Sequence, residues 1–104
     1  MKNKLPLPRI TLQSLKTLQA FMIEPTRELS GADIAKTASL MSGTLYPILI
    51  RFEKAGWLKS RWEDCDPIEA GRPKRRLYRI TGAGQMAFHN SLSQVVPGIL
   101  SWAH

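Results

Sequence analysis

The segment Ser-Gly-Thr-Leu-Tyr-Pro-Ile-Leu-Ile-Arg-Phe-Glu-Lys-Ala-Gly-Trp-Leu, residues 42–58, decides the fold. Its apolar residues recur at i, i+3, i+4 and i+7, the spacing of one α-helical face; they are Leu45, Ile48, Leu49 and Phe52. Ser42 is predicted to cap the helix, because its hydroxyl can accept a free backbone N–H of the first turn. Pro47 is expected near that first turn, and Gly56 suits the left-handed residue that follows many helices. The segment therefore predicts an amphipathic helix followed by an extended stretch.

The face opposite the apolar stripe has small, hydroxyl-bearing and cationic side chains, which suit contacts with a phosphate backbone and with base edges. The predicted DNA contacts of this helix are Ser42, Gly43, Thr44, Tyr46, Arg51 and Lys54. The alternative for Thr44 and Tyr46 is a packing role, in which the Tyr46 ring lies against the preceding helix. Ser42, Gly43 and the helix N-terminus also offer free N–H groups to a phosphate.

The same segment resembles the signature of the PadR family of transcriptional regulators. The matching residues are Gly43-Thr44-Leu45-Tyr46-Pro47, then Arg51, Glu53 and Gly56, with Phe52 in place of the usual Leu, and downstream Gly71-Arg72-Pro73 and Tyr78-Arg79-Ile80-Thr81 with Gly84. The resemblance covers about residues 12–90. It implies a winged helix-turn-helix whose helix at 42–55 enters the DNA major groove, and it permits a small aromatic effector.

Composition bounds the class of protein. A chain of 104 residues has room for one domain. Its net charge of +7 and isoelectric point of about 10.1 favour an anionic partner, for which nucleic acid is the first candidate. The single cysteine, Cys65, excludes a disulfide framework and fits the cytoplasm. The longest apolar run, residues 45–50, is too short to span a membrane, and the N-terminus lacks the apolar centre of a signal peptide.

Two helices are predicted before the central one. Residues 1–10 are expected to form an extended arm, and Thr11 to cap a helix that runs to about Ile23 and buries a stripe that includes Leu12. Ser30 and Asp33 have the spacing of a capping box that opens a second helix, which ends near Thr37 or Ala38. A short helix, a brief turn and the helix at 42–55 make a helix-turn-helix pair.

Residues 57–64 and 74–80 alternate in polarity and predict two strands around a loop rich in proline and glycine, which is a wing. Trp62 and Tyr78 are expected in the core of this wing. Its predicted DNA contacts are Arg72, Lys74, Arg75 and Arg76; the alternative is a hairpin edge kept soluble by charge. For Arg72, insertion into an A·T-rich minor groove and contact with a phosphate remain equal alternatives.

Thr81 is predicted to cap a final helix, which Pro97-Gly98 should kink or interrupt. Apolar residues follow one another there at heptad spacing and predict a two-fold dimer interface; they are Phe88, Leu92, Val95, Ile99 and Trp102. The alternative for Trp102 is a flat surface for an aromatic effector.

No catalytic constellation is present in the sequence. His89 and His104 lack partners at metal-ligand spacing, and no loop has the pattern that cradles a nucleotide. We therefore predict neither an enzyme nor a site for a metal or cofactor.

Together these patterns predict a mainly α protein with a small β-hairpin wing (α+β). Residues 1–81 form the winged helix-turn-helix region and residues 82–104 the dimerisation helix, within one structural domain. The predicted function is that of a sequence-specific, dimeric transcriptional repressor that binds double-stranded DNA and responds to an effector. The alternative is a winged-helix module that binds protein or RNA without reading DNA sequence.

Overall fold

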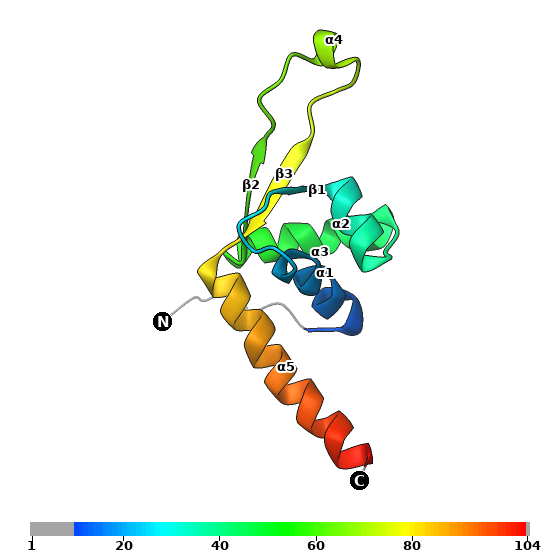
Figure 1. The fold of residues 1–104 in the computed structure, drawn as a ribbon, viewed down its shortest axis with the longest axis vertical. Helices are drawn as coiled ribbons and strands as arrows, with labels where there is room; N and C mark the ends of the chain where they lie inside the picture. The colour runs from blue at the N-terminus through cyan, green and yellow to red at the C-terminus, as the bar shows by residue number, and fades with distance from the viewer. Residues whose placement is uncertain (1–9, 104) are drawn as a thin grey trace.

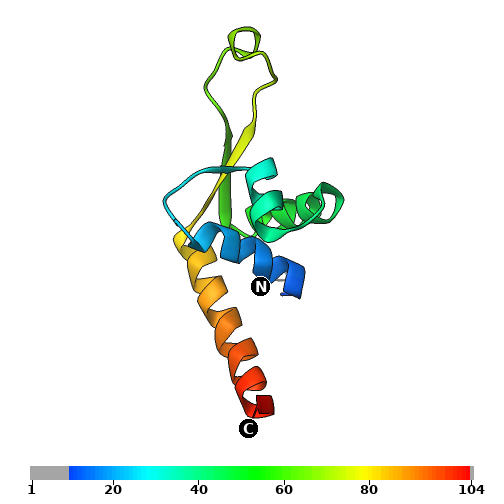
Figure 2. The ribbon, with the colours of Figure 1, turned by 45° about the vertical axis from the view of Figure 1, so that its right-hand side comes forward.

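A computed structural model describes the backbone of residues 10–103 and the side chains of residues 10–93. Most of the predicted arm lies outside these residues. The described elements are, in chain order, α1 (Leu12–Met22), β1 (Leu29–Ser30), α2 (Gly31–Ala38), α3 (Ser42–Lys54), β2 (Leu58–Trp62), α4 (Pro67–Ala70), β3 (Arg76–Ile80) and α5 (Gly82–Ala103). Helices α1–α3 gather in the middle of the molecule (Figure 1), and the hairpin and α5 leave them in opposite directions in both views (Figure 2). The predicted α+β class is confirmed.

Local capping signals place the starts of α1 and α2 as expected. Thr11 Oγ1 accepts a hydrogen bond from the Ser14 backbone N–H at 3.1 Å, which caps α1. Ser30 and Asp33 form the predicted capping box, since each side chain accepts from the other residue's backbone N–H at 3.1 Å. Both caps depend on residues within one turn of each other, which is why the sequence reveals them.

The predicted N-cap of α3 is wrong. The cap position is Met41, which has no side-chain cap bond, and Ser42 is the first helical residue. The chain turns at Ser39, whose φ is 56°, and the Met41 carbonyl then accepts the first bonds of α3, including one from the Leu45 N–H. Pro47 consequently lies inside the helix. Gly56 follows the C-cap with a φ of 81°, as expected of a left-handed residue.

The sheet is antiparallel with the order β1-β3-β2. In the wing hairpin Leu58 lies opposite Ile80, and Ser60 opposite Tyr78. Strand β1 was not predicted, because its two residues are too few to show an alternating pattern. Helix α4, at the tip of the wing, was also missed, although Asp66 caps it and the left-handed Gly71 ends it.

The core lies between α1–α3, the base of the hairpin and the start of α5. Its largest fully buried apolar side chains are Leu18, Phe21, Ile34, Leu45, Leu49, Phe52 and Leu58. Two sequence predictions about burial are wrong: Leu12 is 72% exposed in the first turn of α1, and Trp62 is 60% exposed at the far end of β2. Tyr78, nearer the base of the hairpin, is buried as predicted. The core therefore reaches only partway along the wing.

Helix α5 starts at Gly82, after the Thr81 cap, whose Oγ1 accepts from the Gly84 N–H at 3.1 Å. It is continuous through Pro97-Gly98. Of the two predicted effects, the interruption is therefore wrong, and the kink stays a prediction; proline removes one helical hydrogen bond without having to end the helix. Phe88, predicted to face a partner subunit, is instead buried in the core of its own chain, and Leu92 packs against that core. The side chains of Val95, Ile99 and Trp102 lie outside the described residues. Within the described part of the chain, no helix combines the length and the apolar composition needed to cross a membrane.

Candidate nucleic-acid interface

Helix α3 divides into a buried stripe and an exposed face. All six residues predicted to contact DNA from this helix are exposed. At 3.6 residues per turn, Gly43, Ile50 and Lys54 point away from the buried stripe. Thr44 and Arg51 lie along one flank of that face. The exposed face thus carries cationic and hydroxyl groups around an apolar centre at Ile50, which is 53% exposed.

Tyr46 lies on the other flank of α3 and packs against the start of α2. A Cβ atom placed on Gly31 would lie 2.3 Å from Tyr46 Oη and 2.9 Å from its Cζ. Only glycine therefore leaves room for this ring position. Tyr46 is 43% exposed: its ring packs against the preceding helix, as the packing alternative predicted, and it is still accessible to a ligand.

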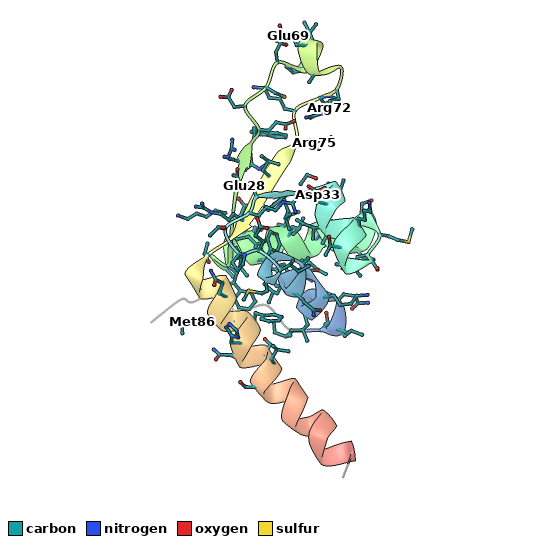
Figure 3. All side chains as sticks on the ribbon, viewed as in Figure 1. Glu28, Asp33, Glu69, Arg72, Arg75 and Met86 are labelled. Atoms are coloured by element: carbon teal, nitrogen blue, oxygen red, sulfur yellow. The ribbon has the colours of Figure 1, made fainter. Side chains whose placement is uncertain are left out.

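Two of the four predicted wing contacts are unpaired. Lys74 and Arg75 are exposed, and neither side chain has a hydrogen bond or ion pair within residues 10–93. We call these two residues the wing cations. They lie between the tip of the wing and β3, as Figure 3 shows for Arg75.

Arg72, a third predicted contact of the wing, is paired with a carboxylate inside the wing. Arg72 Nη1 donates to Glu63 Oε1 in a short hydrogen bond, and its Nη2 donates to Glu63 Oε2 at 3.3 Å. Glu63 Oε1 also accepts from the Arg75 backbone N–H at 3.0 Å. The hydrogen bond from Arg72, followed by that from Arg75, lowers the pKa of Glu63 to about 2. These contacts, which we call the tip clamp, close the loop that carries α4. They engage Nη1 and Nη2 of Arg72, so a DNA phosphate would compete with Glu63 for this side chain.

Arg76 is held by residues of two other elements. Its Nε donates to Ser60 Oγ at 3.0 Å, and the Ser60 hydroxyl donates to Glu53 Oε2 at 2.5 Å. Arg76 Nη2 lies 3.9 Å from Glu53 Oε2. The guanidinium carbon also lies 5.1 Å from the centroid of the Trp62 ring, within the range of a cation–π contact. We call Glu53, Ser60, Trp62 and Arg76 the helix–wing network, because it joins α3 to both strands of the wing.

A groove of about 540 Å³ lies between the first residues of α2, the Tyr46 flank of α3 and the wing. Tyr46, Trp62 and Tyr78 give it aromatic walls, and the wing cations line it as well. At the start of α2, the backbone hydrogen bond from Ser30 is the main cause that lowers the pKa of the Asp33 carboxyl. The cations of the wing and the exposed flank of the recognition helix therefore border one hollow.

On the face of the hairpin opposite the helix–wing network, a bidentate ion pair joins β2 to the residue before β1. Arg61 Nε and Nη2 donate to the two carboxylate oxygens of Glu28 at 2.6 and 2.7 Å, and the hydrogen bond from Arg61 lowers the pKa of Glu28. Sequence patterns did not single out Glu28, Glu53 or Glu63 as partners of arginines. No local signal could have found the first pair, since 33 positions separate its members.

Nothing in the described part of the chain has the geometry of a metal site, because no three His, Cys, Asp or Glu side chains there come together suitably. Cys65 in the wing loop is not an activated thiol: burial, and next the hydrogen bond with Glu63, raise its pKa. The chemistry offered by the described surface is that of contact with an anion.

Comparison with known proteins gives a family and a fold. The model of the transcriptional regulator PadR-like family matches residues 26–90. A PadR-like transcriptional regulator from Bacillus cereus superposes with a TM-score of 0.65 at 20% identity, over 89% of this chain and 95% of that chain. A PadR family transcriptional regulator from Eggerthella lenta gives a TM-score of 0.63 at 19% identity, over 89% and 88% of the two chains.

A third similar structure is Bordetella bronchiseptica BpsR, whose DNA binding is regulated by 6-hydroxynicotinic acid. It has a TM-score of 0.66 at 15% identity, over 93% of this chain and 67% of that chain. At such identities the three structures show a shared fold. No curated protein sequence matches the chain.

Proposed function

The chain belongs to the PadR-like family of transcriptional regulators, and from this we propose that it acts as a dimeric repressor that binds double-stranded DNA through α3 and the wing. The observation that carries the proposal is the common hollow: the Tyr46 flank of the recognition helix and the wing cations border the same groove. One duplex can then contact both, with base edges against α3 and phosphates against the wing.

In this mode α3 enters the major groove with its exposed face. The proposed contacts are Ser42, Gly43, Thr44, Tyr46, Arg51 and Lys54, all of them exposed. Arg51 and Lys54 have no ion pair within residues 10–93, so both charges are available to DNA. Ile50, at the centre of the face, suits the apolar contact that a thymine methyl group offers.

We propose that residues 82–104 join two chains about a two-fold axis, while residues 1–81 contact DNA. Support comes from the heptad spacing of Leu92, Val95, Ile99 and Trp102, and from the course of α5, which leads away from α1–α3 (Figure 1). An aromatic effector is part of the proposal, because the DNA binding of a regulator of similar fold is regulated by 6-hydroxynicotinic acid. Contact with such an effector is the alternative to dimer packing for Trp102. A cytoplasmic, non-enzymatic role is also part of the proposal, and the family membership supports it.

Selection from a random duplex pool tests the proposal. We expect enrichment of an inverted repeat with half-sites about 10 bp apart or a multiple of that distance. Preference over random DNA should reach roughly a thousandfold at physiological salt. If no symmetric repeat is enriched and a protein or RNA is recovered instead, the proposal is refuted and the interaction module replaces it.

A further inference from the structure

The helix–wing network occupies the side of the molecule that is proposed to face DNA, yet its central residue is acidic. Glu53 lies on α3, seven positions before Ser60 on β2, and its carboxylate accepts from the Ser60 hydroxyl at 2.5 Å. We infer that Glu53 is a positioning residue that sets the wing relative to the recognition helix, so that both contact one duplex. This inference rests on the proposed function and deepens it.

One hydroxyl connects the parts of the network. Ser60 Oγ donates to Glu53 and accepts from Arg76 Nε at 3.0 Å, so it relays the contact from α3 across β2 to β3. Arg76 also lies over the Trp62 ring, with its guanidinium carbon 5.1 Å from the ring centroid, which adds a second contact to this side chain. A recognition helix and two strands are thereby tied at one point.

The tie matters because packing holds the base and the middle of the hairpin but not its outer end. Leu58 on β2 and Ile80 on β3 are buried opposite each other. Four positions further along, Trp62 lies opposite Arg76 and is exposed. Beyond the base, β1 pairs with β3 at Leu77 and Tyr78. The side-chain hydrogen bonds and ion pairs that join the outer half to the rest of the chain are the network on one face and the Glu28–Arg61 pair on the other. The wing cations lie immediately before β3, at the outer end of the hairpin, so their position depends on how this end is held.

If Glu53 acted through its charge alone, removing it would change DNA affinity in the opposite direction from a positioning role. A carboxylate beside a DNA-contacting surface repels phosphates, so removing it should strengthen binding to every duplex. A positioning role predicts weaker binding to the selected operator, because misplacing the wing costs contacts that the extra charge does not restore. The sign of the change therefore separates the two explanations.

The test uses Glu53→Ala with Glu69→Ala as its matched control. Glu69 is also an exposed helical carboxylate, lies at the tip of the wing (Figure 3) and forms no ion pair within residues 10–93. Both variants lose one negative charge and gain a strong helix former. We expect Glu53→Ala to weaken operator binding by about tenfold, corresponding to the coupling of contacting residues. The slope of log K against log salt should become shallower by up to about two, because the wing cations lose their phosphate contacts. Glu69→Ala should bind as well as the wild type or slightly better. Tighter operator binding by Glu53→Ala would overturn the inference.

A second measurement works on the free protein. Spin labels at Thr37→Cys on α2 and Ile68→Cys at the wing tip, both exposed sites, report the helix-to-wing distance when Cys65 is replaced by Ser. Labelled chains are diluted with unlabelled ones so that only distances within one chain are measured. Glu53→Ala should broaden the distance distribution, and the exchange Glu53→Arg with Arg76→Glu should narrow it again, because Ser60 can donate in one direction and accept in the other. An unchanged distribution in Glu53→Ala refutes the positioning role alone, whereas a wild-type chain that selects no duplex refutes the proposed function.

Discussion

Two glycines in the first turn of α5 provide a matched test of how tightly this helix is seated. A Cβ atom on Gly84 would lie 2.3 Å from the backbone oxygen of Trp57 and 2.7 Å from Ile80 Cγ1. A Cβ atom on Gly82 would meet nothing within 4 Å. The two positions therefore differ in packing, while both lie in the same turn of the same helix.

The expected magnitudes follow from these distances. At Gly82, alanine should stabilise the helix by up to about 1 kcal/mol through its better helix propensity. At Gly84 the same gain is opposed by a contact with backbone that must move by about an ångström to reach van der Waals distance. The Trp57 carbonyl accepts from the Thr81 N–H at 3.0 Å, so that movement also strains the junction of β3 with α5. Overpacking of this kind costs roughly 1–3 kcal/mol or more, and we expect Gly84→Ala to destabilise the protein by about 2–3 kcal/mol.

Thermal unfolding followed by circular dichroism, at one fixed protein concentration, measures both effects. A change of 1 kcal/mol shifts the Tm of a domain of this size by roughly 4–8 °C, so Gly84→Ala should melt about 10–20 °C below the wild type. Gly82→Ala should melt at or above the wild-type temperature. If both variants melted within a few degrees of the wild type, α5 would not be seated as the structure shows.

Three further predictions concern caps, charges and pH. Ser30→Ala should cost about 1 kcal/mol because it removes the capping box, whereas Ser42→Ala should be nearly neutral by chemical denaturation, since Ser42 makes no cap bond. Replacing either of the wing cations with alanine should make the slope of log K against log salt shallower by about one; an unchanged slope would exclude that residue as a phosphate contact. The carboxyl of Glu63 should titrate by NMR at about pH 2 and move toward its ordinary 4.5 in Arg72→Ala. Because the folded pKa is depressed, the stabilisation from this group is present above about pH 4.5 and lost as pH falls through about 2.

What the sequence predicted well is what neighbouring residues determine. The caps at Thr11, Ser30 and Thr81 and the apolar stripe of α3 all depend on spacings of three or four positions, and the structure has them as expected. Helix α4 carried a local signal of the same kind, a capping Asp66 before proline, which went unused.

The errors have a different physical origin. Alternation assigned Trp62 to the same face of the wing as the core residue Leu58, but alternation does not say how far the core extends along a strand. The ion pairs of Glu28 and Glu53 join residues that are 33 and 23 positions from their arginines, and the fold alone brings them together. The burial of Phe88 in its own chain likewise depends on where α1 crosses α5.

The distribution of charge in the wing shows why the difference between local and fold-dependent features affects function. The sequence has five basic residues within positions 72–79, and counting them suggests a broad contact with phosphates. In the structure these five residues differ in their partners and in the face of the hairpin on which they lie. The tip clamp engages Arg72, the helix–wing network engages Arg76, and Arg79 lies opposite Lys59 on the other face of the hairpin from the groove.

Only the wing cations are then left unpaired beside the groove, so the wing should contribute about two phosphate contacts per chain and not five. Two arginines are paired with carboxylates that give the wing its shape. Much of the wing's positive charge therefore serves to orient the residues that bind. The predicted salt slope is correspondingly shallow for a protein of this net charge, and a steep slope from the wing would show that Arg72 and Arg76 also contact phosphates.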